Sequence, residues 1–380
     1  MAGLSTNLVH ADDSLERVPD VVQPINITTT FKYSDDPEEL VIAKQIDDTK
    51  ISTGRPVYSR LSHPNSTKCE EVLSTLLNGH VVIYNSGLSA FFAALTYYAP
   101  KVLSIGNGYH GCHGIANIFT RLNGLKQVTL DVNEIDQHIG KGDVIHLETP
   151  VNPEGIAFDI KFFADKAHSK GAFLLVDATF APPPLQDPFL HGADMVLHSA
   201  TKYFGGHSDL LAGCLVTKDP EVKYQLVRDR VYLGTNIGNL ESYLLLRSLR
   251  TYEMRILKQS ENATKLVKYL ADNIDKYSAL EKVYHASLEV DEKPFIKEQL
   301  SGGFPPVFSI IVKDPSVARQ LPSKLKYFHH ATSLGGVESL IEWRAMSDSK
   351  VIETLLRVSC GVENVEDMIA DFDQALSSFN

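Results

Sequence analysis

The stretch VLHSATKYFGGHSDLLAG, from Val196 to Gly213, carries the strongest indication of fold and function in this 380-residue chain. An apolar run ends at His198, and Ser199, Thr201 and Lys202 follow within four residues, ahead of a glycine pair. A strand that ends in this way can present an amine to a bound carbonyl while the hydroxyls hold an anionic group beside it. The pattern indicates a lysine that forms a Schiff base with pyridoxal phosphate, although a solvated lysine on a surface turn gives the same short motif.

Composition limits the classes of protein to which the chain can belong. Hydrophobic residues make up 43% and charged residues 22%, so a large core is available, and at this length a large domain with a smaller one is expected. The formal charge of -11 argues against a nucleic-acid surface, because phosphate binding needs clustered Lys and Arg. The four cysteines lie far apart without metal-ligand spacing, so we expect buried thiols and no metal site.

The N-terminal segment gives no indication of export. MAGLSTNLVHADDSLERV has neither a basic apolar signal core nor an arginine-rich transit pattern, and no apolar run approaches membrane length. We expect a soluble protein of the cytoplasm, with the nucleus as the alternative, and no membrane partner. Residues 1–60 are polar and punctuated by prolines, so we expect an arm that lies over a neighbouring subunit, or else a disordered arm. Tyr58 and Arg60 at its end form a pair that suits phosphate.

Short apolar runs alternate with helical patterns over residues 61–245. Thr67 to Asn78 predicts a helix with Thr67 and Glu70 as a capping box. A strand at 81–84 runs into a helix at about 88–98, and another helix is predicted at 160–169. Further strands are predicted near 102–105, 128–130, 143–148, 172–177, 194–198 and 213–217. This alternation indicates an α/β sheet covered on both faces, with its ligand at the carboxyl ends of the strands.

Polar residues gather where these strands end. The turn Ser86-Gly87-Leu88 opens a helix, so its free N–H groups favour an anion, although tight packing explains the small residues equally well. Glu148 and Asp177 each follow an apolar strand. Three prolines soon after Asp177 argue against a helix cap there, and a pyridinium nitrogen is a suitable partner for its carboxylate.

The pattern changes beyond residue 245. A long helix at about 239–271, strands near 306–312 and 354–360, and a final helix at about 364–379 predict a smaller α+β domain over residues 246–380. His329 and His330 are interpreted as structural. Several arginines are expected on solvated faces or interfaces: Arg228, Arg230, Arg247, Arg250 and Arg255.

These motifs, in this order, resemble the Cys/Met-metabolism family of pyridoxal-phosphate enzymes, which includes the cystathionine γ-synthases, β-lyases and γ-lyases. The resemblance runs from VQPINITTTF at 22–31 to the C-terminus and is greatest to the little-characterised fungal trans-sulfuration-like members. It implies an aspartate-aminotransferase-like fold of type I, with a mainly parallel seven-stranded sheet in a large domain at 61–245. It also implies a homodimer or homotetramer with shared active sites.

The resemblance implies roles for individual residues as well. Lys202 would bind the cofactor covalently and act in catalysis with Tyr109, which would stack on the ring. Asp177 would pair with the pyridine nitrogen, beside Thr179, and Asn152 would lie near the ring hydroxyl. Arg357 would bind the substrate α-carboxylate with the help of Ser333. The phosphate would be held by Ser86, Gly87, Leu88, Ser199 and Thr201, with Tyr58 and Arg60 from a neighbouring subunit.

The chain departs from the family pattern in the half of the pocket that receives the distal end of the substrate. The usual Asp-Asn-Thr has Ala178 at its centre, and Thr332 stands where a glutamate is common. The loop Tyr109-His110-Gly111-Cys112-His113-Gly114 lacks the usual arginine, and the segment after Trp343-Arg344 is short. Three hypotheses remain: a carbon–sulfur lyase that acts on cystathionine or a related amino acid by α-proton abstraction and elimination, a γ-replacement enzyme that uses an O-acyl-homoserine, and a low-turnover, cofactor-binding regulatory protein.

Overall fold

The computed structural model describes residues 3–15, 18–45 and 56–380. Its larger sheet has seven strands in the order β1-β7-β6-β5-β4-β2-β3. Strand β7 runs antiparallel to both of its neighbours, whereas the other pairings are parallel, so the expectation of a mainly parallel seven-stranded sheet is confirmed. The strands are β1 (His80–Tyr84), β2 (Val102–Ile105), β3 (Lys126–Val128), β4 (Val144–Glu148), β5 (Phe173–Asp177), β6 (Met195–His198) and β7 (Gly213–Thr217).

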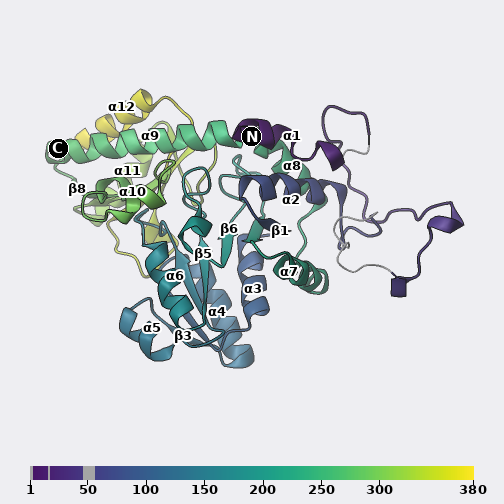
Figure 1. Cartoon of the computed structure of the whole chain (residues 1–380). Coiled ribbons are helices and arrows are strands. Elements are labelled where there is room, and N and C mark those ends of the chain that lie inside the picture. Colours follow the sequence, from purple (N-terminus) through teal and green to yellow (C-terminus); the bar gives the residue numbers. More distant parts are fainter. Residues whose placement is uncertain (1–2, 16–17, 46–55) are drawn as a thin grey trace.

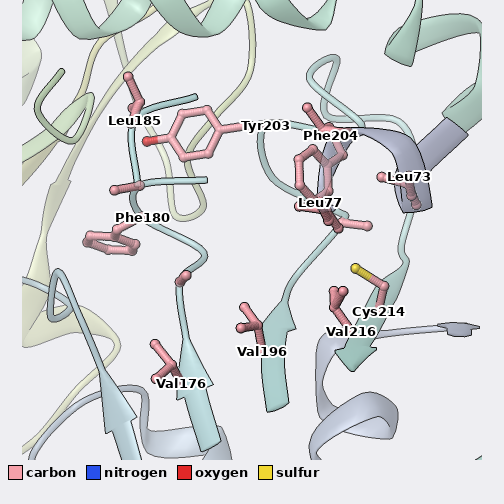
Figure 2. Close-up of a cluster of buried hydrophobic side chains, with 14 of the residues drawn as sticks. Leu73, Leu77, Val176, Phe180, Leu185, Val196, Tyr203, Phe204, Cys214 and Val216 are labelled. Carbon is pink, nitrogen blue, oxygen red and sulfur yellow. The ribbon is translucent and has the colours of Figure 1, made fainter. Parts of the chain in front are cut away.

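Helices cover both faces of this sheet because its central strands are apolar on both sides. In β5, Leu175 points to one face, and Leu174 and Val176 point to the other. The first face packs against α3 (Gly87–Tyr98), α4 (His110–Asn123) and α7 (Pro220–Leu233). The opposite face packs against α2 (Pro64–Leu76), α6 (Ile160–Ser169) and α8 (Asn239–Leu249), and Figure 2 shows part of this core between the strands and Leu73, Leu77 and Phe204.

A second sheet of five strands follows in the order β10-β11-β12-β9-β8. It has its own core with α11 (Pro315–Lys324), α12 (Val365–Ser377) and the second half of α9 (Tyr252–Asp272), as the α+β expectation required. Figure 1 shows α9 extending along the molecule, so that its first half packs on the larger domain. The boundary expected at residue 245 stays a prediction. The strands are β8 (Leu280–Tyr284), β9 (Val307–Val312), β10 (Phe328–His330), β11 (Ser339–Trp343) and β12 (Leu355–Ser359).

The long helix expected at 239–271 is wrong, because α8 and α9 are separate helices that meet at Arg250 and Thr251. At the break, the carbonyl of Ser248 accepts hydrogen bonds from the Thr251 amide at 3.2 Å and from the Arg255 side chain at 2.9 Å. Arg255 is therefore buried rather than on a solvated face. The apolar pattern continues through the break, so periodicity alone does not reveal it.

The capping box predicted at Thr67 and Glu70 is also wrong. Helix α2 begins earlier, at Pro64, and the His63 ring accepts a hydrogen bond from the Asn65 amide at 3.2 Å. Glu70 faces the core instead, where its carboxylate accepts from the Ile83 amide at 3.1 Å and from Arg230 at 2.6 Å. Arg230 is thus a second arginine that was expected near solvent and is buried.

The N-terminal segment is described in two pieces that differ in their contacts. Helix α1 (Leu4–His10) buries Leu8 against the body. In the second piece, residues 18–45, Gln23 donates to Asn65 and the Thr28 carbonyl accepts from Asn239, while other parts extend away from the body (Figure 1). Apolar side chains on this second piece are exposed, with Val21, Val22 and Ile27 at 105%, 66% and 73%. Among the described residues, no helix combines the length and apolar character that a membrane span requires.

Candidate active site

The site predicted from the sequence is a cavity of about 560 Å³ at the carboxyl ends of β4, β5 and β6. Its wall includes every predicted site residue except Tyr58 and Arg60. The larger sheet and its loops contribute most of these residues, and the loop before β11 and strand β12 contribute Ser333 and Arg357. The predicted residues that line the cavity are Ser86, Gly87, Leu88, Tyr109, Asn152, Asp177, Thr179, Ser199, Thr201, Lys202, Ser333 and Arg357.

Lys202 lies in the turn that follows β6, and its amine points to the second domain. The Nζ atom donates a hydrogen bond to Ser333 Oγ at 2.8 Å. The backbone of Ser333 is left-handed, with a φ of +82°. Nearby, Gly335 packs closely against the chain after Lys202, and a Cβ added at Gly335 would lie only 2.7 Å from the Tyr203 amide nitrogen. Burial, followed by the positive charge of Arg357, lowers the pKa of Lys202 to about 8, and Glu342 opposes this shift. The amine is therefore available as a base close to neutral pH.

Two carboxyl groups, the buried Asp177 and the partly buried Glu148, lie side by side at the ends of β5 and β4. Asp177 accepts hydrogen bonds from the amide and hydroxyl of Thr179 at 3.0 and 2.6 Å. Burial raises the pKa of Asp177 to about 6 although these hydrogen bonds oppose it. Glu148 is its partner in the sheet register, and burial together with the charge of Asp177 raises the pKa of Glu148 to about 8. A cation placed beside Asp177 would restore its charge.

Glu148 also fixes two loops that carry predicted site residues. Its carboxylate accepts from the Tyr109 amide at 2.6 Å and from the Asn152 amide at 2.8 Å. Gly108 lies against this carboxylate, and a side chain there would overlap it. The sequence placed Glu148 at a strand end but gave no reason to assign it this role.

An anion cradle forms where α3 begins. Ser86 caps the helix by accepting from the Ser89 amide at 3.1 Å, so other amides of the first turn are left to bind an anion. Gly87 is pressed against Ser199, whose Cβ would be 3.1 Å from a Cβ added at Gly87. Thr179 Oγ1 accepts from the Ser199 amide at 2.9 Å, which ties this cradle to the Asp177 loop.

Arg357 is the centre of a buried ionic network. It donates to Asn152 Oδ1 at 2.8 Å, to the Ser333 carbonyl at 3.0 Å and to Glu342 Oε2 at 2.6 Å. Burial lowers the pKa of Arg357 to about 10, although Glu342 opposes this shift. Removal of one partner from a buried ion pair destabilises a folded protein by about 3–5 kcal/mol. The ion pair with Glu342 therefore holds the Arg357 guanidinium firmly in place.

The sequence missed Glu342 and Arg344 as site residues. Glu342 lies opposite Arg357 in the β11–β12 register, and Arg344 and Ser347 border the cavity. Strand β11 was not predicted, so the cross-strand pairing that brings Glu342 to Arg357 was not foreseen. The signal in the sequence was a Glu-x-Arg spacing at the end of an apolar run.

The positions that depart from the family pattern differ in where they lie relative to the cavity. Gly114, which stands where the family has its arginine, is exposed and does not border the cavity, and a Cβ added there would meet nothing within 4 Å. Thr332 borders the cavity, and Ala178 is buried. Tyr58 and Arg60 do not border it, and Arg60 instead donates to the Val231 carbonyl of its own chain at 3.0 Å.

Comparison with known proteins defines the class of this site. The crystal structure of cystathionine gamma-lyase from yeast superposes with a TM-score of 0.85 at 27% identity, covering 99% of this chain and 98% of the other. Cystathionine beta-lyase of Lactococcus lactis subsp. cremoris is 30% identical, over 99% of each chain. Cystathionine gamma-synthase of Escherichia coli strain K12 is 33% identical, over 95% of this chain and 94% of its own length.

The fold and the lysine-containing cavity are those of a pyridoxal-phosphate-dependent enzyme. A family profile described as "Cys/Met metabolism PLP-dependent enzyme" matches residues 5–377. The chain belongs to this family, and its cofactor is pyridoxal 5′-phosphate. The resemblance inferred from the sequence is thereby confirmed.

We expect the Lys202 amine of the cofactor-free protein to titrate near pH 8, because burial and Arg357 disfavour its charged form. Glu342→Gln should lower this pKa further, because it removes the carboxylate that favours the charged form. The measurement is the pH dependence of acetylation by acetic anhydride, read by peptide mass spectrometry with exposed Lys161 as the internal reference. A midpoint near the ordinary lysine value of 10.5 would contradict this account.

Proposed function

We propose that the protein is a carbon–sulfur lyase that acts on cystathionine or a related thioether amino acid. In the β-elimination form, the Cα–H and Cβ–S bonds break, the sulfur leaves as a thiol, and water releases pyruvate and ammonia. In the γ form, the Cγ–S bond breaks and the products are a thiol, 2-oxobutyrate and ammonia. The proposal is supported by relatives that are named as lyases of both kinds.

The residues of the cavity suit the cofactor in three respects. Lys202 offers an amine for covalent attachment, Asp177 a buried carboxyl for the pyridine nitrogen, and the cradle at Ser86 to Leu88 an anion site for the phosphate. Ser199 and Thr201 complete the cradle, Thr179 holds Asp177, and Tyr109 and Asn152 border the ring position in this proposal. When bound, pyridoxal phosphate supplies an electron sink for the carbanion at Cα.

Each remaining step is assigned to a side chain of this chain. Arg357 binds the substrate α-carboxylate, and Asn152 and Ser333 orient it. Lys202 Nζ takes the α-proton, since its lowered pKa leaves a larger fraction of the amine unprotonated near neutral pH than an ordinary lysine has. Burial raises the pKa of the Tyr109 phenol, which therefore keeps its proton and can donate it to the leaving sulfur.

One observation carries the proposal. Ser333 accepts from the Lys202 amine through its hydroxyl and from Arg357 through its carbonyl. A base and a carboxylate clamp are thus joined by one residue, and an amino acid held at Arg357 presents its α-carbon near the amine. A cofactor-binding regulator would have no need of this clamp.

Product analysis tests the proposed reaction. The holoenzyme incubated with L-cystathionine should release a thiol together with one 2-oxo acid: pyruvate with homocysteine for β-elimination, or 2-oxobutyrate with cysteine for γ-elimination. Asp177→Asn should reduce the rate by several orders of magnitude, because a neutral amide cannot keep the pyridine nitrogen charged. The assay is 2-oxo acid and thiol quantification. Formation of cystathionine from cysteine and an O-acyl-homoserine, without lyase products, would instead establish the γ-replacement alternative.

We further propose that the enzyme is at least a homodimer, with a tetramer of paired dimers as the larger form. The exposed apolar side chains of residues 18–45 lack a covering surface within the described part of the chain. Tyr58 and Arg60 end this arm and lie outside their own cavity, so a neighbour's phosphate site is the place where they would act.

The four buried cysteines are free thiols, which suits the reducing cytoplasm.

Mixed oligomers test the shared site. Arg60→Ala and Lys202→Ala homo-oligomers should each be nearly inactive, because each lacks one component of every site. With equal amounts of freely exchanging subunits, about half of the dimers are mixed. One of the two sites in each mixed dimer carries neither lesion, so about a quarter of all sites should regain activity. Exchange is verified by native mass spectrometry. Verified exchange without any recovered activity would mean that Arg60 does not act across the interface.

A further inference from the structure

Arg344 is a buried cation at the cavity for which the proposed mechanism has no use. It lies just after β11, its side chain is 4% exposed, and it borders the same cavity as Lys202. Its Nη1 donates to Glu342 Oε2 at 3.0 Å. This is the same carboxylate oxygen that binds Arg357, so the two guanidinium groups flank one carboxylate.

The other donors of Arg344 are poorly satisfied. Its Nη2 lies 3.6 Å from Asp348 Oδ2, beyond hydrogen-bond length, and its Nε has no hydrogen-bond partner within the described residues. Buried guanidinium groups normally find partners for their five N–H donors. Arg230 also has an unpartnered Nε, but it does not border the cavity.

Two other buried arginines provide the comparison. Arg255 uses all three of its nitrogen atoms in hydrogen bonds to Thr251, Tyr203 and Ser248. Arg357 is held by three acceptors from different elements. Arg344 differs from Arg255 in having donors left over, and it differs from Arg357 in having a single hydrogen-bonded acceptor and a fully buried Nε without a partner among the described residues. A carboxylate is the group that satisfies such a fork best, because it accepts two parallel N–H bonds.

The position of Arg344 relative to Arg357 indicates which part of a substrate it meets. Because Glu342 joins the two guanidinium groups, a substrate whose α-carboxylate binds Arg357 has Arg344 nearby along the same wall. Ser347, which also borders the cavity, donates to the second oxygen of Glu342, Oε1, at 2.6 Å. This oxygen is therefore already engaged, and Glu342 binds Arg344 through Oε2 alone. The loop from Tyr109 to Gly114 has one side chain with a basic group at the cavity, His110.

We propose that Arg344 is a specificity-determining residue that binds an anionic group at the distal end of the substrate side chain. The enzyme accordingly prefers α-amino acids whose sulfur substituent carries a carboxylate to those whose substituent is neutral. This inference rests on the proposed function for the identity of the reaction, but the charge preference is a property of binding and is measurable without turnover.

The test uses pairs of thioethers that differ only in distal charge. S-carboxymethyl-L-cysteine is compared with S-carbamoylmethyl-L-cysteine, and S-(2-carboxyethyl)-L-cysteine with S-(2-carbamoylethyl)-L-cysteine, so that two lengths are sampled. The readout on the holoenzyme is kcat and KM for thiol release. For any compound that is not turned over, it is the dissociation constant measured by calorimetry. In at least one pair we expect the acid to be favoured about tenfold or more over the amide, mainly in KM or Kd.

Four variants locate the source of this preference. Arg344→Gln should bring the acid-to-amide ratio close to one, and Arg344→Lys should retain part of the preference. Asp348→Asn should increase the ratio, because it removes the carboxylate that competes for Nη2. This third variant alters a residue outside the cavity wall and keeps the test valid if Arg344→Gln does not fold. His110→Gln is the matched control within the cavity and should leave the ratio unchanged.

The outcomes separate this inference from the proposed reaction. Thiol release with equal constants for acid and amide at both lengths overturns the role of Arg344 and leaves the lyase intact. A charge preference in calorimetry, with no release of thiol or 2-oxo acid from these thioethers or from L-cystathionine, supports Arg344 and overturns the lyase. A preference that disappears in His110→Gln but survives in Arg344→Gln assigns the anion to His110 and overturns the proposal.

Discussion

Burial of ionisable groups at the carboxyl edge of the seven-stranded sheet is the constraint on which the site depends. Loss of hydration lowers the pKa of the Lys202 amine and raises the pKa values of the Asp177 and Glu148 carboxyls. A shift of one pKa unit corresponds to about 1.4 kcal/mol, so each group is held in a state that a bound ligand can change at modest cost. The apolar strands around these groups supply this effect. Thr179 donates a hydrogen bond to Asp177, and Ser333 accepts one from Lys202, so both ionisable groups are held in position.

The second domain completes the site rather than merely flanking it. Ser333 and Arg357 reach the larger domain through Lys202 and Asn152, and Glu342 fixes Arg357 from the neighbouring strand. The position of Arg357 is thereby coupled to that of the lysine through Ser333. Glu342 serves two arginines at once, which leaves Arg344 with unused donors beside the same cavity.

The sequence predicted those parts of the structure that local pattern controls. The strands of the larger sheet, the cradle at Ser86 and the polar residues at the ends of β5 and β6 follow from apolar runs that stop at hydroxyl or carboxyl groups. The ionic network at Arg357 did not follow, since it depends on a pairing between β11 and β12 that no short motif reveals. The capping box at Thr67 failed for a related reason, because Glu70 is used by Arg230 in the core.

The central claim is that Lys202 carries the cofactor, and borohydride reduction tests it most directly. Reduction of the holoenzyme fixes the cofactor to the lysine that holds it, and peptide mass spectrometry then identifies that lysine. The account predicts that the adduct lies on Lys202, in the sequence Ser199-Ala200-Thr201-Lys202, and that Lys202→Ala abolishes it. An adduct on any other lysine of the wild-type protein would contradict the account.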